Sequence, residues 1–397
     1  MPPKQKATLD NETKRTLLLG RASNRLSIGL VGLPNVGKST LFNAISKKNV
    51  PMENRPFCTI DPTTARVPVP DEKYDWLLGF YKPKASHPAF LDVTDIAGLV
   101  RGAHKGEGLG NEFLGNIQKV DGIFHVVRAF DDDMTPHVEG TVDPCRDLEV
   151  IADELRFKDI SLVEKTIEQL KTKHRVTMTN EVKLQLAIFE KLLAHLESGK
   201  DVYTGDWEAE DIMIINTLHL LSAKPVVYVV NMSRKDYRRQ KNKYLKTIIE
   251  WVHQRTDGRG KIIPVCAEYE HELRIMEDPA AVQQIVEAEG MPQGIGKVIQ
   301  AGFQALQLIK YYTCSENLVD TWTLRAGSLA PAAAGVIHSD FEKTFISGEV
   351  FNYEDLKKYG SLAEVRAHGC YKQIGKTYEV QDGDIALWKA GSAHSRK

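Results

Sequence analysis

The chain has 397 residues, which is enough for two or three domains. Hydrophobic residues make up 42% and charged residues 26%, and these values exclude a disordered, collagen-like or fibrous protein. Lysine plus arginine (52) nearly equals aspartate plus glutamate (53), so the net charge of −1 does not by itself indicate a nucleic-acid or membrane partner. Local charged patches remain compatible with this balance.

The termini and the cysteines favour a cytosolic protein. The first residues lack the apolar core of a secretion signal, and no window approaches the roughly 18 apolar residues that a membrane-spanning helix needs. Five cysteines lie far apart without a CxxC pair, which fits reduced thiols better than disulfides or a zinc site. We therefore expect a cytoplasmic protein without a transmembrane segment, with polar tails at residues 1–24 and 391–397.

Short aliphatic runs with little polar alternation are typical of buried parallel strands. Five such runs occur, at residues 26–31, 90–95, 122–130, 225–230 and 261–265. Because helical stretches separate them, we predict a doubly wound α/β domain with a mainly parallel sheet. Its two parts are expected at residues 25–145 and 220–303.

An insert separates the two parts of this predicted domain. Residues 146–219 contain no convincing strand, and aliphatic residues recur there at spacings of three, four and seven. We predict an antiparallel helical hairpin that forms a short coiled coil; the alternative is ordinary amphipathic helices on the sheet. Beyond these parts, short strand-like pieces separated by glycines predict a small α+β domain over residues 304–390.

A phosphate-binding loop follows the first predicted strand. Residues 32–39 match G-x-x-x-x-G-K-[ST] without a mismatch, and a helix start follows them, so a mere glycine-rich turn is the weaker interpretation. Backbone N–H groups of such a loop surround the phosphates, its lysine reaches the β- and γ-phosphates, and its serine hydroxyl binds Mg²⁺. The predicted nucleotide-binding residues of this loop are Asn35, Val36, Gly37, Lys38, Ser39 and Thr40, and Lys38 is also predicted to assist catalysis.

Three longer stretches resemble the Obg-like ATPase (YchF) family of translation-factor-class P-loop NTPases. They are Pro-Phe-Cys-Thr-Ile-Asp-Pro at 56–62, Asp-Ile-Ala-Gly-Leu-Val at 95–100 with the glycines of 106–110, and Ala-Gly-Val-Ile-His-Ser-Asp-Phe-Glu-Lys at 334–343. The resemblance covers nearly the whole chain. It implies a P-loop nucleotide domain, an inserted coiled coil and a C-terminal TGS domain of the β-grasp type.

Metal ligands are expected in the phosphate loop and in two switch segments. Thr59 lies in a proline-bracketed loop and is predicted to bind Mg²⁺ with Ser39, although a loop threonine alone is usually only solvated. Asp95 ends a strand and is predicted to reach the same ion through water. Gly98 is predicted to offer its N–H group to the γ-phosphate.

The residue that positions the attacking water is less obvious. Ras-like enzymes carry a glutamine after the glycine of D-x-x-G, and this chain has Leu99 there, which cannot form a side-chain hydrogen bond. Histidine can take this role near neutral pH, and the candidates are His137 and His104. The resemblance points to His137, whose alternative is a solvated loop histidine. His125, within an apolar strand, reads as a core residue.

The base-reading segment departs from the guanine code. GTPases use N-K-x-D after a buried strand, and here the frame reads Asn231-Met232-Ser233-Arg234. Arginine has no acceptor for the N–H donors of guanine, so ATP is the preferred nucleotide, with the Met232 thioether packing on the base. Asp236 could substitute as the acceptor, which leaves GTP open. The predicted base-side residues are Asn231, Met232, Cys266 and Ala267.

A basic run over 234–246 is either a solvated helix face or a contact for an RNA backbone. The leading hypothesis is a slow Mg²⁺-dependent ATPase that acts as a monomeric nucleotide switch on ribosomes, ribosomal RNA or translation- or stress-related partners, with an activating protein as a further partner. One alternative is a GTPase or a dual-specificity enzyme. The other is a nucleotide-stabilised RNA or protein adaptor that barely hydrolyses.

Overall fold

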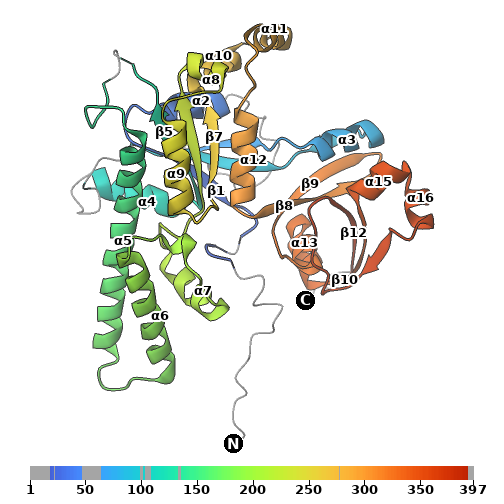
Figure 1. Cartoon of the computed structure of the whole chain (residues 1–397). Coiled ribbons are helices and arrows are strands. Elements are labelled where there is room, and N and C mark those ends of the chain that lie inside the picture. The colour runs from blue at the N-terminus through green and yellow to red at the C-terminus, as the bar shows by residue number, and fades with distance from the viewer. Residues whose placement is uncertain are drawn as a thin grey trace, which may run out of the picture. The chain divides into compact units, whose positions relative to one another are not determined.

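The computed structural model describes residues 18–21, 23–46, 64–98, 102, 109–132, 136–276 and 278–391. Thr59, Leu99 and His104 lie outside the described residues. The chain divides into two compact units (Figure 1). The first comprises Met1–Arg21, Ser27–Val67 and Asp92–Ala305, and the second comprises Ala22–Leu26, Pro68–Leu91 and Leu306–Lys397.

The first unit is built on a six-stranded sheet with the order β2-β4-β1-β5-β6-β7. Pairing is parallel from β4 through β7, and every residue of β5 is buried, which confirms the predicted doubly wound sheet. The strands are β1 (Ser27–Val31), β2 (Thr64–Pro68), β4 (Phe90–Asp95), β5 (Gly122–Ala129), β6 (Val226–Met232) and β7 (Lys261–Val265). The sequence analysis did not predict β2.

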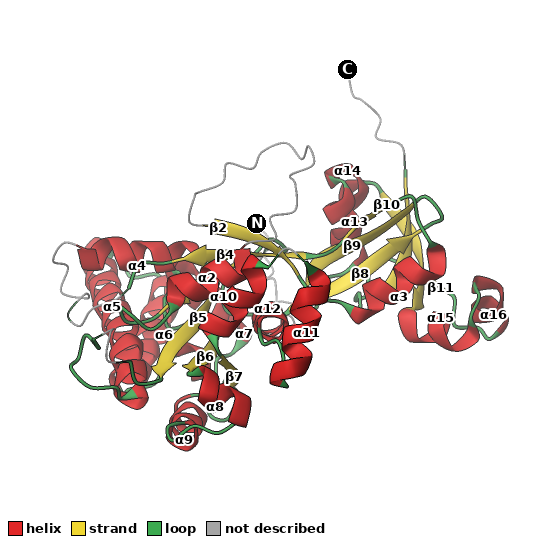
Figure 2. Cartoon of the chain, turned by 90° about the horizontal axis from the view of Figure 1, so that it is seen from above, coloured by secondary structure: helices red, strands yellow, loops and turns green. Residues whose placement is uncertain are grey.

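Helices cover both faces of this sheet (Figure 2). On β5, Phe124 faces α12 (Ile295–Ala305), since a Cβ atom at Gly302 would lie 2.4 Å from its ring. The next residue, His125, faces α5 (Pro144–Lys173) and α9 (Leu245–Arg255). The remaining helices of the unit are α2 (Lys38–Ser46), α4 (Leu109–Lys119), α6 (Asn180–Glu197), α7 (Ala209–Ile215), α8 (Arg234–Arg239), α10 (Ala267–Ile275) and α11 (Pro279–Glu289), with short 3₁₀ turns at Val202–Thr204 and Asn216–Leu218.

The insert forms a helical hairpin of α5 and α6, which run side by side in Figure 1. The side chain of Asp143 accepts a hydrogen bond from the N–H group of Arg146 and caps α5, and Thr179 caps α6 in the same way. The first turns of α5 pack on the sheet through Leu148 and Ile151. Farther along, the helix pairs with α6 through a separate apolar core that includes Val163, Ile167, Leu186, Phe189, Leu192 and Leu196.

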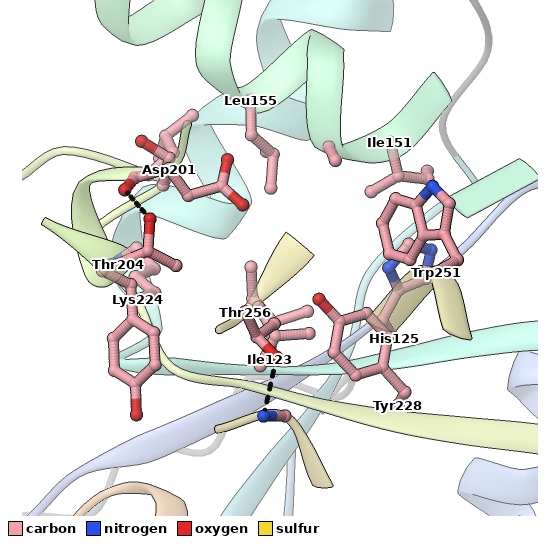
Figure 3. A pocket seen from close by; sticks show the side chains of 16 residues that line it. Ile123, His125, Ile151, Leu155, Asp201, Thr204, Lys224, Tyr228, Trp251 and Thr256 are labelled. Carbon is pink, nitrogen blue, oxygen red and sulfur yellow. Dashed lines mark hydrogen bonds between the residues drawn. The ribbon is translucent and has the colours of Figure 1, made fainter. Parts of the chain in front are cut away.

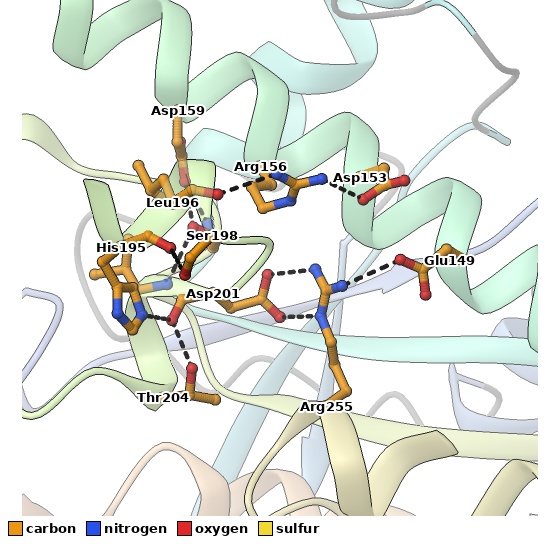
Figure 4. Close-up of polar contacts among 12 residues, drawn as sticks. Glu149, Asp153, Arg156, Asp159, His195, Leu196, Ser198, Asp201, Thr204 and Arg255 are labelled. Atoms are coloured by element: carbon orange, nitrogen blue, oxygen red, sulfur yellow. Dashed lines mark hydrogen bonds and ion pairs between the residues drawn. The ribbon is translucent and has the colours of Figure 1, made fainter. Parts of the chain in front are cut away.

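Ion pairs and hydrogen bonds fasten the base of the hairpin (Figure 4). Arg255 of α9 donates to both carboxylate oxygens of Asp201, at 2.9 and 2.8 Å, and to Glu149 of α5 at 3.2 Å. Arg156 of α5 donates to the carbonyl oxygen of Leu196 at 3.0 Å. The start of α5 is therefore held to α9, and its middle is held to the end of α6.

The second unit is an α+β domain with a mixed sheet of order β11-β10-β12-β8-β9-β3. Strands β8 and β9 are antiparallel, β12 and β8 are parallel, and β3 pairs with β9 in parallel. The strands are β3 (Ala85–His87), β8 (Leu308–Cys314), β9 (Leu318–Arg325), β10 (Phe345–Asn352), β11 (Lys372–Ile374) and β12 (Asp384–Ala390); the helices are α3 (Glu72–Tyr81), α13 (Ala330–Ile337), α14 (Ser339–Lys343), α15 (Tyr353–Tyr359) and α16 (Leu362–Ala367).

The second unit also contains residues 68–91, which the sequence analysis had kept within the nucleotide domain at 25–145. Packing explains the difference, because Tyr74 and Leu77 of α3 are buried in a core with Tyr312. The carboxylate of Asp71 accepts a hydrogen bond from the Tyr312 hydroxyl at 2.8 Å and pairs with Lys310 at 2.9 Å. Among the described residues, no helix has the length and apolar character that crossing a membrane requires.

A buried carboxylate is expected to set much of the stability at the base of the hairpin. Asp159 of α5 accepts hydrogen bonds from the N–H of Leu221 at 2.8 Å and from the N–H and hydroxyl of Ser222 at 2.7 Å each. Asp159→Ala leaves these buried donors unpaired and should lower the free energy of unfolding by ~3 kcal/mol in urea denaturation. Asp153→Ala on the same helix is the control and should cost ~0.5 kcal/mol, because its ion pair is partly exposed. Equal losses for the two variants would contradict this reading of Asp159.

Candidate functional site

The predicted phosphate loop lies between β1 and α2, where strand, turn and helix meet as the motif requires. Asn35 and Gly37 both adopt positive φ angles, +63° and +94°. A Cβ atom at Gly37 would lie 2.3 Å from the Asn231 side-chain nitrogen, so only glycine fits there. The first turn of α2 begins with Lys38, Ser39 and Thr40, whose N–H groups are donors of the kind that a helix N-terminus offers to an anion.

Lys38 is buried beneath this loop. Its ammonium group donates to the carbonyl oxygens of Gly32 and Leu33, at 3.0 and 2.8 Å. Burial lowers the pKa of Lys38 to about 8, and the negative charge of Asp95 partly opposes that shift. Gly98 lies next to the Lys38 ammonium group, since a Cβ atom built at Gly98 would lie 3.1 Å from the Lys38 nitrogen. The structure therefore brings together the lysine and the switch glycine that were predicted separately.

Ser39 and Asp95 have the chemistry of a Mg²⁺ site. The Ser39 hydroxyl donates to one carboxylate oxygen of Asp95 at 3.1 Å, and the other oxygen is buried without a hydrogen-bond partner in the described part of the chain. Burial raises the pKa of Asp95, while the bond from Ser39 lowers it. An unpaired buried carboxylate oxygen beside a hydroxyl suits a hydrated hard cation. Among the described residues, no group of three or more His, Cys, Asp or Glu has the geometry of a metal site.

Asn231 at the end of β6 joins the phosphate loop to the base side of the site. Its amide nitrogen donates to the Val36 carbonyl oxygen at 2.9 Å, and its amide oxygen accepts from the N–H of Ala267 at 3.0 Å. Cys266 is buried directly before α10. Among the four residues predicted around the base, Asn231 therefore uses both its amide nitrogen and its amide oxygen to hold two segments together.

The predicted role of the Met232 side chain is wrong in this structure. Met232 is 2% exposed and belongs to a core cluster with Val127, Tyr237 and Tyr269. Its thioether packs into the protein interior, so it is not available to stack on a base. Only the backbone of Met232 remains as a candidate contact.

Arg234 is held by acidic side chains from two other helices. Its guanidinium pairs with Glu272 of α10 and with Glu289 of α11, which also pairs with Arg238. These contacts raise the pKa of Arg234 and leave it as a cation with no acceptor to offer. Asp236, the suggested substitute, accepts a hydrogen bond from the side-chain amide of Asn242 at 2.9 Å.

The sequence analysis missed Arg128, which is 1% exposed at the end of β5. Its guanidinium donates to the carbonyl oxygens of Asn35 at 3.3 Å, Phe130 at 3.1 Å and Asp132 at 3.4 Å. The arginine thereby links the phosphate loop to the acidic loop, the segment of the sequence from Asp131 to His137 that follows β5. A charged residue in an otherwise apolar strand is the signal that could have identified it.

His137 lies beside the phosphate loop, but its ring is closed off. The Asn35 amide donates to the carbonyl oxygen of Pro136 at 3.2 Å, which places the loop. The His137 ring contacts Asp147 through Nε2 at 2.7 Å, and its Nδ1 accepts from the N–H of Glu139 at 3.1 Å. Only 2% of the side chain is exposed. In this conformation both ring nitrogens contact protein groups, so the predicted catalytic role requires the imidazole to leave this position.

A separate small cavity of about 40 Å³ lies between the sheet, α5 and α9 (Figure 3). It is lined by His125, Tyr228 and Trp251 among others. His125 is buried, and burial lowers its pKa to about 3, so it is a neutral core residue as expected. None of the predicted nucleotide or metal residues lines this cavity.

The basic run over 234–246 is partly neutralised. Besides Arg234 and Arg238, Lys243 pairs with Asp131 at 2.8 Å. Exposed cations remain at Lys235, Arg239 and Lys241. The surface is therefore less basic than the sequence alone indicates.

The two hydrogen bonds of the Asn231 side chain are expected to support nucleotide binding, and a substitution tests this. Asn231→Ala removes the donor to Val36 and the acceptor for Ala267 together, so the phosphate loop should loosen and nucleotide affinity should fall at least ~10-fold in calorimetric titration. Asn242→Ala, which removes a partly buried amide on the same unit without touching the loop, is the control. Equal affinity of Asn231→Ala and the parent protein would contradict this role.

Comparisons with known proteins agree with this geometry. Residues 27–166 match the model MMR_HSR1, described as a 50S ribosome-binding GTPase, and residues 308–391 match the C-terminal YchF-GTPase model, described as a protein of unknown function. The chain is 51% identical to the Obg-like ATPase 1 of Oryza sativa subsp. japonica over 389 residues, which is 98% of each chain. It is 45% identical to the Homo sapiens Obg-like ATPase 1 over 400 residues, with both chains fully covered.

A solved structure extends the agreement to the fold. The structure described as the Schizosaccharomyces pombe YchF GTPase matches with a TM-score of 0.84 and 46% identity, covering 94% of this chain and all of the other. The resemblance noted in the sequence and the predicted fold class are both confirmed. The chain belongs to the Obg-like ATPase (YchF) family of P-loop nucleotide hydrolases.

Proposed function

We propose that this chain is a slow Mg²⁺-dependent ATPase that acts as a nucleotide switch on ribosomes or translation-related partners in the cytosol. One observation supports ATP over GTP as the preferred nucleotide. The phosphate loop is intact, while the position that would read guanine holds Arg234, fastened to Glu272 and Glu289. The names of the relatives do not decide the matter, because some are called ATPases and one is called a GTPase.

The argument for ATP rests on hydrogen-bond complementarity. Guanine presents N–H donors on the edge that a GTPase aspartate reads, and Arg234 can only donate. Losing that charge-assisted contact costs ~1.5–3 kcal/mol, or roughly 10- to 100-fold in affinity. Adenine presents one donor and one acceptor, which the backbone around Met232 can satisfy.

The phosphate loop also supplies part of the proposed Mg²⁺ site. Ser39, Asp95 and Thr59 would hold Mg²⁺, whose charge offsets that of the β- and γ-phosphates. Ser39 and Asp95 contact each other and fit this use. Lys38 and the N–H of Gly98 would then bind the γ-phosphate. His137 would position the attacking water, and turnover would be slow because its ring starts from a closed position.

The proposed partner is a ribosome or its RNA, with a monomer as the acting form. The exposed cations Lys235, Arg239 and Lys241 support contact with a phosphate backbone. The family model that matches the nucleotide domain is described as a ribosome-binding GTPase, which supports the same partner class. An activating protein or a monovalent cation would raise the basal rate by ordering the site.

ATP should bind at least as tightly as GTP in calorimetric titration with Mg²⁺. Arg234→Ala should leave the ratio of the two affinities within about 2-fold of the parent, because the side chain contacts Glu272 and Glu289. Lys235→Ala, an exposed cation on the same helix, is the control.

A tenfold preference for GTP would contradict the proposal and favour the GTPase alternative. Tight ATP binding without any single-turnover hydrolysis, with ribosomes present or absent, would instead favour the adaptor. The two outcomes come from different measurements and can be told apart.

A further inference from the structure

Helix α5 contacts two loops of the nucleotide site through acidic side chains. Asp147, in its first turn, contacts the ring of His137 at 2.7 Å. Glu154 accepts a hydrogen bond from the N–H of Gly102 at 2.6 Å, in the segment that follows the D-x-x-G motif. The two acids are seven residues apart, close to two helical turns, so they lie on one face of α5. One helix therefore holds both loops.

The hydrogen bonds of His137 define its protonation state. Nδ1 accepts from the N–H of Glu139, so it carries no proton, and the ring proton is on Nε2, which donates to Asp147. The second carboxylate oxygen of Asp147 is itself held by Arg146 at 3.1 Å. Both side chains of the His137–Asp147 pair are 2% exposed. Neither ring nitrogen has a lone pair or a proton left for water.

A second contact fixes the position of the His137–Asp147 pair relative to the phosphate loop. Asn35 contacts the carbonyl oxygen of Pro136, one residue before His137. The loop is thus anchored to the phosphate loop at Pro136 and to α5 at His137. Breaking the second anchor frees the imidazole while the first keeps it near the phosphates.

We propose that Asp147 is a positioning residue that restrains His137 in a closed position, and that hydrolysis requires this hydrogen bond to open. The inference rests on the proposed function, in which His137 serves the attacking water. Since Asp147 belongs to the helix that continues into the hairpin, a partner that moves α5 opens the site. The hairpin is thereby coupled to the rate of hydrolysis.

Single-turnover ATP hydrolysis tests the restraint. Asp147→Ala should raise the basal rate about 10-fold, because the closed position loses a charge-assisted hydrogen bond, while the KM for ATP stays unchanged. Asp147→Asn keeps the shape and an acceptor oxygen and should give a smaller rise, which guards against a folding defect. Asp153→Ala, on the same helix but paired with Arg156, should match the parent. In the double variant Asp147→Ala/His137→Ala the gain should vanish.

A second readout does not depend on hydrolysis. Diethyl pyrocarbonate modifies an imidazole nitrogen that is unprotonated and accessible, and peptide mass spectrometry locates the product. Labelling of His137 should rise several-fold in Asp147→Ala and stay at the parent level in Asp153→Ala. Unchanged labelling would overturn the proposal. The labelling experiment tests the restraint of His137 by Asp147 independently of catalysis. If His137→Ala hydrolyses ATP like the parent, only the proposed catalytic role of His137 is refuted.

Whether the hydrolysis rate of Asp147→Ala rises or falls shows whether Asp147 restrains His137 or orients it for the reaction. If Asp147→Ala hydrolyses ATP as slowly as His137→Ala, Asp147 orients the imidazole for the reaction and the proposal is overturned. An unchanged rate in Asp147→Ala, with His137→Ala slowed, overturns it as well, because His137 then leaves its position without regard to Asp147.

Discussion

The side-chain amide of Asn231 holds the phosphate loop against the start of α10, and the geometry of the nucleotide site depends on that contact. Its nitrogen binds the Val36 carbonyl and its oxygen binds the Ala267 N–H. The close approach is possible because Gly37 has no side chain. An amide can serve both groups at once since it carries a donor and an acceptor. Through this residue the end of β6 fixes the position of the phosphate loop relative to the start of α10.

A second set of contacts ties the site to the rest of the first unit. Arg128 connects the phosphate loop to the acidic loop. Helix α5 holds the acidic loop at His137 and holds the second switch, the segment after the D-x-x-G motif, at Gly102. The same helix packs on the sheet with its first turns and pairs with α6 farther along. The nucleotide loops and the hairpin therefore contact the same helix, which is the physical connection that the proposed coupling would use.

Local patterns in the sequence were sufficient for the phosphate loop and the five aliphatic strands. A glycine-rich turn between a strand and a helix has few other uses, and buried parallel strands need continuous apolar runs. Strand β2 was missed because Thr-Ala-Arg-Val-Pro is short and alternates in polarity. The segment 68–91 was placed in the wrong unit because its packing against Tyr312 depends on residues far along the chain.

The roles of single side chains were harder to predict for the same reason. The partners of Arg234 lie 38 and 55 residues away, and no spacing rule connects them. Met232 reads as a base contact until its burial in the core is known. His137 stands out as a loop histidine, but only the fold shows that Asp147 closes it off. Thr59 stays a prediction, since it lies outside the described residues.

The central claim is that an imidazole replaces the missing switch glutamine, and single-turnover hydrolysis by His137→Ala tests it most directly. The rate should fall by ~10²-fold or more, while ATP affinity measured by calorimetry stays within about 2-fold of the parent. His104→Ala, the matched histidine of the second switch, should hydrolyse ATP normally. If His137→Ala keeps the parent rate and His104→Ala loses it, the second switch positions the water and the claim is wrong.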